Sequence, residues 1–449
     1  MHRSILPGLS DRLRDLCPIL TNEPVMIEII LALGLVITAA TQLRAGGLPL
    51  GPGELVLLVW LCLAGLRQLL SRPLILNAAL ARVLSFWFVM VVCLCVGMTV
   101  GLLVEPFQDY GGMLRDTVAY AFVFSFSVMM AVTMLDAADR RQLSWSIVLI
   151  GSISLILQIG SGLGKVPMPG VDPWYWDRLR GWAENPNQLG FFALFIALLG
   201  LHLADQATTK IEALRALAAI APAIVAGVMS RSDSFMIGIF VSGGLFVTLK
   251  SVSWLRDTEM APTMRGAAVV LAILTLPLAL LISVPFTSAA LSRIENVSNQ
   301  VYADNDQGDT RLHLWVEAID KGIQSKLAGF GPGPHLTSKS FKRPPPDKFE
   351  VHNTLLDLLT QGGIVAMMAF VWISVTALLA AARAGHPALA GLVAGLLVFS
   401  MFHYALRQPI FWFGIVLCLL DMTGTVKSLP PRVPPRRAVQ EDRGGRAYS

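Results

Sequence analysis

Two polar segments, each at the start of a long apolar run, hold the side chains best suited to chemistry. The first spans residues 181–188 and contributes Glu184, Asn185 and Asn187. The second lies far downstream and begins with His352 and Asn353. Histidine titrates near neutral pH, so His352 is a natural general base toward a hydroxyl group. Polar clusters at the mouths of membrane helices typically mark where a membrane enzyme meets a polar headgroup.

Arginines form a second group of candidates, because arginine stays charged and offers phosphate a planar fork of donors. Arg231 lies in a tight turn between two apolar runs, where Asp233 would either pair with it or cap the next helix. Arg311 begins an amphipathic segment, at a position where the helix dipole disfavours a cation. A partner is therefore expected for Arg311, either an anionic ligand or the nearby Asp306 or Asp309.

The remaining candidates each have a structural alternative. An arginine at an interface can simply extend toward the headgroups, and a lone histidine there is more often structural than catalytic. Asn353 can serve as a helix cap. The candidates in this group are Arg178, Arg180, His335, His403 and Arg407, of which His335 follows the turn-rich sequence of residues 329–334.

The composition indicates how these residues are positioned. Of the 449 residues 54% are hydrophobic and only 14% are charged, whereas soluble domains carry about a quarter charged residues. Because a helix needs about 20 apolar residues to cross a membrane, the sequence predicts an all-α polytopic protein of about twelve transmembrane helices. The predicted spans are centred on residues 25–43, 53–70, 83–104, 117–135, 145–160, 189–204, 212–229, 233–249, 266–285, 358–382, 387–402 and 408–425.

Lysine and arginine gather in alternate loops, which predicts that both termini are cytoplasmic. Residues 1–24 form the cytoplasmic N-terminal segment, 25–285 hold helices 1–9, and 353–425 hold helices 10–12. Residues 286–352 form a large outer loop, and 426–449 form a basic tail with too little apolar surface to fold. Within the outer loop, Thr310 to Gln324 reads as an amphipathic helix packed over the helix mouths, with its apolar side chains along one side: Leu312, Trp315, Val316, Ile319 and Ile323.

Other chemistries find little support in the sequence. No zinc-type histidine pair, Walker loop or glycine-rich dinucleotide turn is present. The loosely spaced Asp304, Asp306 and Asp309 do not have the pattern of a metal site. The sequence thus predicts no metal, no cofactor and no nucleic-acid partner.

The order of these motifs resembles that of the O-antigen ligase and Wzy-type polymerase superfamily, over roughly residues 180–385. The shared order is the segment 182–188, then Ser230-Arg231-Ser232, then Arg311, Gly329-Phe330-Gly331-Pro332-Gly333 and His352-Asn353 in a long loop. The resemblance implies a bacterial inner-membrane glycosyltransferase acting at the periplasmic face without a metal or nucleotide sugar. Its donor would be a glycan on undecaprenyl diphosphate. Arg231 and Arg311 would bind the diphosphate, His352 would activate the acceptor hydroxyl, and displacement would invert the anomeric centre.

Three interpretations follow. The first is an O-antigen ligase, whose acceptor is lipid A–core, and the alternative is a polymerase, whose acceptor is a second lipid-linked repeat unit. The third is a lipid-linked sugar transporter. Transporters keep ionisable groups near the bilayer midplane, whereas Glu28, Glu54 and Asp357 all lie near the ends of predicted spans.

Overall fold

The computed structural model describes residues 24–44, 50–71, 75–105, 109–256, 261, 263–271, 273–275, 277–278, 281, 310–337 and 348–421. The structure leaves outside these ranges most of the predicted N-terminal segment, the predicted tail 426–449, and residues 286–309 and 338–347 of the predicted outer loop. Asp306 and Asp309, the proposed partners of Arg311, therefore also lie outside the described residues.

The described chain is mostly helical, as predicted. Its long helices are α4 (Pro52–Ser71), α5 (Ala78–Val104), α6 (Tyr110–Thr133), α7 (Ala137–Gly162), α8 (Pro186–Asp205), α9 (Lys210–Met229), α10 (Asp233–Arg256) and α13 (Thr354–Arg383). All eight are long and apolar enough to cross a membrane. Shorter helices are α3 (Pro24–Ile37), α12 (Thr310–Gln324), α14 (Pro387–Ser400) and α15 (Pro409–Asp421). The predicted count of about twelve spans stays a prediction, because several predicted spans coincide with apolar helices shorter than 18 residues.

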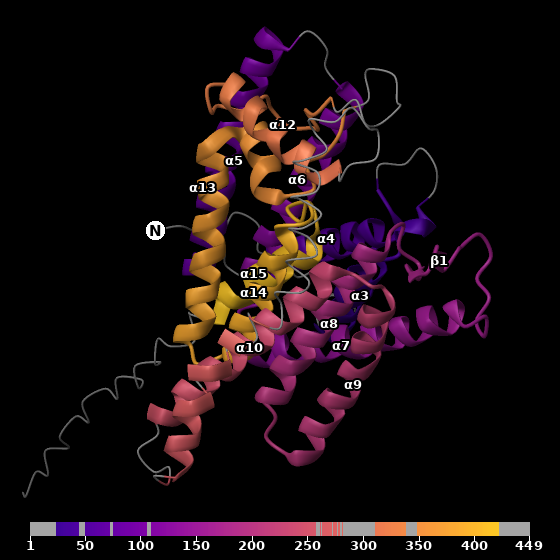
Figure 1. Ribbon diagram of the computed structural model, residues 1–449, viewed down its shortest axis with the longest axis vertical. Helices are drawn as coiled ribbons and strands as arrows, with labels where there is room; N and C mark the ends of the chain where they lie inside the picture. The colour runs from indigo at the N-terminus through magenta and orange to yellow at the C-terminus, as the bar shows by residue number, and fades with distance from the viewer. Residues whose placement is uncertain are drawn as a thin grey trace, which may run out of the picture.

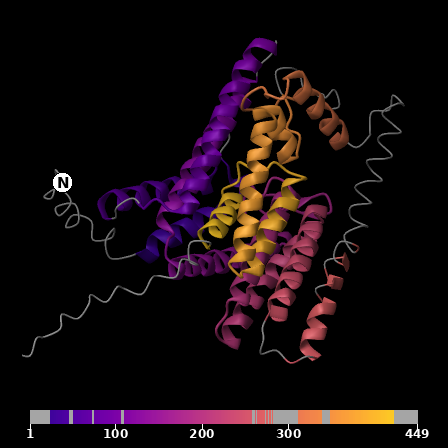
Figure 2. The same ribbon diagram turned by 90° about the vertical axis from the view of Figure 1, so that its left-hand side faces the viewer.

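The core lies around α8, α14 and α15. These helices are apolar on all sides and nearly all their residues are buried, which is typical of helices surrounded by other helices. Helices α4, α5 and α9 instead expose aliphatic side chains such as Leu69, Leu103 and Leu214, as expected where a helix faces lipid. Figures 1 and 2 show α14 and α15 enclosed by the longer helices.

Helix α7 is longer than the predicted span 145–160. The side chain of Asp136 accepts a hydrogen bond from the backbone N–H of Ala138 and caps the helix at its start. The first turns, with Arg140 and Arg141, are therefore helical although they are not apolar. After α7, two short strands, β1 (Trp174–Tyr175) and β2 (Arg178–Leu179), form an antiparallel hairpin before α8.

Helix α13 is broken at Gly363, whose φ of 72° and ψ of −167° are not helical. The segment 327–331 fills the break: Phe330 and Gly331 donate backbone hydrogen bonds to the carbonyls of Thr360 and Gln361. The N–H of Ile364 donates to the carbonyl of Leu327. Irregular backbone at membrane depth is tolerated when protein buries it and satisfies its polar groups, as these bonds do.

Glycines allow this segment to approach its neighbours. A Cβ at Gly97 of α5 would lie 2.4 Å from the carbonyl oxygen of Gln361, and one at Gly101 would lie 2.2 Å from that of Phe330. Gly331 has a φ of 98°, a conformation open mainly to glycine. The glycine-rich sequence 329–333 therefore has a structural role in closing α13 against α5.

Glu105, the residue after α5, connects the end of α5 to α12 and to the loop that follows it. Its buried carboxylate binds Lys321 of α12 at 3.0 Å, Lys348 at 2.5 Å and His335 at 3.3 Å. Burial raises the pKa of this carboxyl, but the bonds from His335 and the two lysines outweigh burial and lower it to about 2. The carboxylate thus stabilises the fold above its ordinary pKa, and this contribution disappears as the pH falls toward 2.

The predicted helix at 310–324 is confirmed as α12, but its predicted face is wrong. Leu314 and Ala318 are buried, with Trp315 packed beside them, whereas Val316, Ile319 and Ile323 are exposed. The pairing of Lys321 with Glu105 and the packing of Gly322 against Leu359 turn the other face inward. Figure 1 shows α12 beside the upper part of α13.

Candidate functional site

A polar cavity of about 130 Å³ lies at the start of α8 and brings together the two polar segments of the sequence. Asn185 and Gln188 line it from α8 and its cap, and His352 lines it from the segment before α13. The loop between α14 and α15 contributes His403, Tyr404 and Arg407, and Glu350 completes the wall. This cavity is the candidate site.

His352 has an exposed side chain and an unusual backbone, with a φ of 57°. The buried carboxylate of Asp357 accepts hydrogen bonds from the N–H groups on both sides, Val351 at 2.8 Å and Asn353 at 3.3 Å. Asn353 caps α13 by accepting from the N–H groups of Leu355 and Leu356. A non-glycine residue in this region is strained and persists only where the surroundings impose it. Asp357 and Asn353 therefore fix the backbone that presents His352.

The start of α8 is held by η1 (Thr41–Leu43), a short 3-10 helix after α3. Asn185 caps α8 by accepting from the N–H groups of Asn187 and Gln188, and Pro186 occupies the first helical position. Thr41 donates to the side chain of Gln188 at 2.8 Å. Gln42 donates to the carbonyls of Asp172, Gly181 and Ala183.

Arg407 is the centre of a charged network beside the cavity. Its guanidinium donates to Asp116 of α6 and, at 2.6 Å, to Glu350. Arg115 also binds both carboxylates, at 2.9 Å and 2.7 Å. The ring of Tyr404 lies 4.9 Å from the Arg407 guanidinium, within range of a cation–π contact. Two arginines thus neutralise two carboxylates, which ties the loop before His352 to α6 and to the loop before α15.

The network also sets the ionisation of Glu350. Burial disfavours its charged form, but the charges of Arg407 and Arg115 and the hydrogen bond from Arg407 outweigh burial and lower the pKa of this carboxyl. Glu350 is therefore an ionised carboxylate at neutral pH, two residues from His352. Below the network, Tyr404 is hydrogen-bonded to Tyr120, which donates to Gln361 at the break of α13.

Arg231 lies on the other side of α8. The turn after α9 gives it a φ of 47°, and its guanidinium pairs with Asp177, both side chains being about two-thirds exposed. The carboxylate that binds it is that of Asp177, which lies between β1 and β2. Gly190 lets this turn approach α8, since a Cβ there would lie 2.9 Å from the Cβ of Ser232. Arg231 does not line the cavity, and the first turns of α8 separate the two.

Arg178 and Arg180 both bind groups in or near the β1–β2 hairpin. Arg178 donates to the side chain of Asn187 at 2.8 Å and to the carbonyl of Ser230 at 3.1 Å, so it fastens the start of α8 to the Arg231 turn. Arg180 binds the carboxylate of Asp172 at 2.8 Å. Glu184, whose N–H bonds Thr41, has an exposed side chain.

His335 and Arg311 both belong to the segment formed by α12 and the loop that follows it. His335 is buried, with Nδ1 against Glu105 and Nε2 2.8 Å from the carbonyl oxygen of Gly331. Both ring nitrogens are engaged in holding the loop, so His335 has a structural role. Arg311 lies in the first turn of α12, one turn before Leu314, which packs with Val351 beside His352. The side chain of Arg311 lies outside the described residues.

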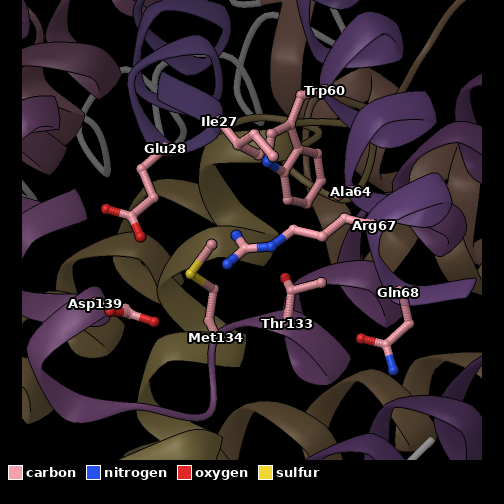
Figure 3. A pocket seen from close by; sticks show the side chains of 9 residues that line it. All are labelled: Ile27, Glu28, Trp60, Ala64, Arg67, Gln68, Thr133, Met134 and Asp139. Carbon is pink, nitrogen blue, oxygen red and sulfur yellow. The ribbon is translucent and has the colours of Figure 1, made fainter. Parts of the chain in front are cut away.

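A second pocket lies at the opposite end of α3, between the start of that helix and the end of α4. Figure 3 shows Arg67 reaching into it toward Glu28, with Asp139 nearby. Its volume of about 20 Å³ admits roughly one water molecule. One carboxylate oxygen of Glu28 and Nε1 of Trp60 are buried there and lack partners in the described part of the chain. The pocket is too small for a sugar.

Comparison with known protein families gives a match that covers part of the helical region. Residues 217–371 match the O-antigen ligase family. This match confirms the resemblance, and it contains Arg231, Arg311 and His352. Asn185 and Arg407 lie outside the O-antigen ligase segment (residues 217–371). No curated protein matches the chain.

Sequence reasoning missed Glu350 and Thr41, which line the cavity, and Asp116, which is buried beside it and binds Arg407. Glu350 lies two residues before His352, but nothing in the sequence distinguished it from the other charged residues of the long loop. Asp116 offered a signal, because a carboxylate so close to an apolar run needs a partner. Arg407 was predicted as a phosphate or interface arginine, but its charge is matched by Asp116 and Glu350 instead.

We expect Arg407→Ala to destabilise the protein far more than Arg115→Ala. Removing Arg407 takes away the less exposed of the two cations that bind the buried Asp116 and the partly buried Glu350, and breaking such a buried pair typically costs about 3–5 kcal/mol. The side chain of Arg115 is 44% exposed, so its loss should cost below about 1 kcal/mol. Thermal unfolding of the detergent-solubilised variants measures both. Equal effects of the two substitutions would contradict the central place of Arg407.

Proposed function

We propose that the protein is a glycosyltransferase that moves a glycan from undecaprenyl diphosphate to a sugar hydroxyl at the periplasmic face of the bacterial inner membrane. The favoured acceptor is lipid A–core, which makes the protein an O-antigen ligase. One observation carries the proposal: His352, inside the matched family segment, is presented by a strained backbone into a polar cavity at the helix ends.

The surroundings of His352 suit a general base. Its backbone is held by Asp357 and Asn353, so the ring has a limited range of positions. The ionised Glu350 nearby favours the imidazolium that forms when the ring takes a proton. Asn185, Gln188 and Thr41 supply amide and hydroxyl groups of the kind that bind sugar hydroxyls.

The reaction can be written from these parts. The imidazole of His352 removes the proton of the acceptor hydroxyl, and the acceptor oxygen forms a bond to the anomeric carbon of the donor. The bond from that carbon to the diphosphate oxygen breaks on the opposite face, so the configuration inverts. The diphosphate leaves with the electron pair, and arginine cations stabilise its added charge.

Arg231 and Arg311 are the proposed diphosphate ligands. The pair formed by Arg231 with Asp177 is exposed, and exposed pairs contribute little to stability, so a diphosphate can displace the carboxylate. Arg231 also stands beside the start of α8, where the helix dipole favours an anion. No metal or nucleotide sugar takes part in the proposed reaction.

Deletion of the gene in its host tests the proposal and separates its two forms. An O-antigen ligase predicts loss of polymer attached to lipid A–core while lipid-linked polymer persists. A Wzy-type polymerase, the alternative, predicts loss of all chains longer than one repeat unit. Movement of a labelled lipid-linked sugar across vesicles by purified protein, with its glycan never transferred, would instead establish a transporter.

We expect Arg231→Ala to reduce glycan transfer about a hundredfold, the typical loss for one preorganised charge stabiliser. Arg231→Lys should recover only part of the rate, because an ammonium cannot replace the guanidinium fork. Arg44→Ala is the matched control: Arg44 is also exposed and pairs with a carboxylate, Glu54, at 3.7 Å. Rates are measured with purified donor and acceptor at equal protein level. Equal rates in the Arg231→Ala and Arg44→Ala variants would remove Arg231 from the site.

We expect His352→Asn to reduce transfer about a hundredfold to ten-thousandfold, the range for loss of a general base. Asparagine tolerates the left-handed backbone of this position, so folding and donor binding should persist. His313→Ala, a change on α12 away from the cavity, is the control. The wild-type rate should fall on acidification, because an imidazolium cannot accept a proton. A variant His352→Asn with nearly full activity would assign the base elsewhere, first to His403.

A further inference from the structure

A groove of about 690 Å³ lies between α7 and α9, away from the cavity of His352. One wall is a stripe of α7 side chains at helical spacing, Leu149, Ile153 and Ile156, each about half exposed. The other wall is made by small residues of α9, Ala218 and Ala219. Large aliphatic side chains therefore face small ones, which leaves an open apolar channel.

The floor of the groove is fixed. The hydroxyl of Ser152 lies 2.6 Å from the carbonyl oxygen of Val148 in its own helix and 2.6 Å from that of Ala219 in α9. This contact holds the two helices together behind the groove. Pro222, inside α9, cannot donate a backbone hydrogen bond and lines the far end.

The length of the groove matches one leaflet of a membrane. From Trp145 to Ile156 the axis of α7 advances roughly 16 Å, at about 1.5 Å per residue. The hydrocarbon core of a bilayer is about 30 Å thick, so the groove spans about half of it. A single acyl chain of one leaflet fits this length.

The end of the groove at the start of both helices is positively charged. Glu212 lines it, but Arg141 and Thr208 bind its carboxylate. Arg215, also on the wall, is exposed and has no carboxylate within ion-pair distance in the described chain. Trp145 stands at the same level, where aromatic side chains gather at membrane interfaces. The positive charge of Arg215 suits an anionic headgroup.

We infer that this groove is a binding site for an anionic phospholipid, with an acyl chain between α7 and α9 and the headgroup phosphate against Arg215. The lipid belongs to the leaflet that holds the starts of both helices, which is the cytoplasmic leaflet on the predicted topology. The site is thus separate from the proposed transferase cavity and does not depend on the reaction assigned to it.

Native mass spectrometry of the delipidated full-length protein tests the inference, with phosphatidylglycerol and phosphatidylcholine added at equal concentration. Wild type should retain phosphatidylglycerol preferentially. Arg215→Gln should weaken this preference about fivefold, the effect of one basic residue near an anionic lipid. Arg215→Lys should preserve it, and Lys210→Gln, a change on the same helix outside the groove, should leave it unchanged.

A second pair of variants tests the acyl channel. Ala218→Phe places a large ring in the groove and should abolish retention of the bound lipid. Ala221→Phe puts the same ring on an exposed position of α9 outside the groove and should have no effect. Retention of phosphatidylglycerol by Arg215→Gln and Ala218→Phe at the wild-type level would overturn the inference.

Discussion

The break in α13 at Gly363 is the feature on which the outer part of the structure depends. A membrane helix that stops hydrogen bonding to itself must find other partners, because lipid offers none. The segment 327–331 supplies them, and Gly97 and Gly101 of α5 give it room. The first turns of α13 are thereby separated from the spanning part of the helix and can serve as a support for the cavity.

These first turns of α13 fix the backbone at His352. The short helical piece before the break carries Asp357, whose carboxylate binds the backbone on both sides of His352. It also carries Thr354, which donates to the carbonyl of His403 and accepts from the N–H of Ala405. One turn of helix thus positions both histidines of the cavity. A histidine on a mobile loop would lose much of its catalytic advantage through misalignment.

The charged groups of the protein divide into two kinds. Arg407 and Arg115 form a matched network with Glu350 and Asp116, in which two cations compensate two carboxylates, so its role is to hold three segments together. Arg231 instead pairs with the exposed carboxylate of Asp177 and does not line the cavity. In the proposed reaction the anomeric carbon of the donor would therefore lie at the start of α8, with the diphosphate toward Arg231 and the acceptor hydroxyl toward His352. The hydrogen bonds of Arg178 to Asn187 and Ser230 fix the spacing of these two regions.

The sequence by itself determined the helical membrane class, the approximate positions of the long apolar helices, and the candidate segments around Asn185, Arg231 and His352. These features depend on hydrophobic periodicity and on residue type, which are local. The tertiary structure alone decided which face of α12 is buried, that Asp177 pairs with Arg231, and that Glu350 and Asp116 enclose Arg407. Each of these depends on which distant segments meet: α12 is oriented by Glu105, and the carboxylates of Asp116 and Glu350 come from segments more than two hundred residues apart. The helical period of apolar residues is the same whichever face of a helix is buried. Only packing against other segments therefore decides which face that is.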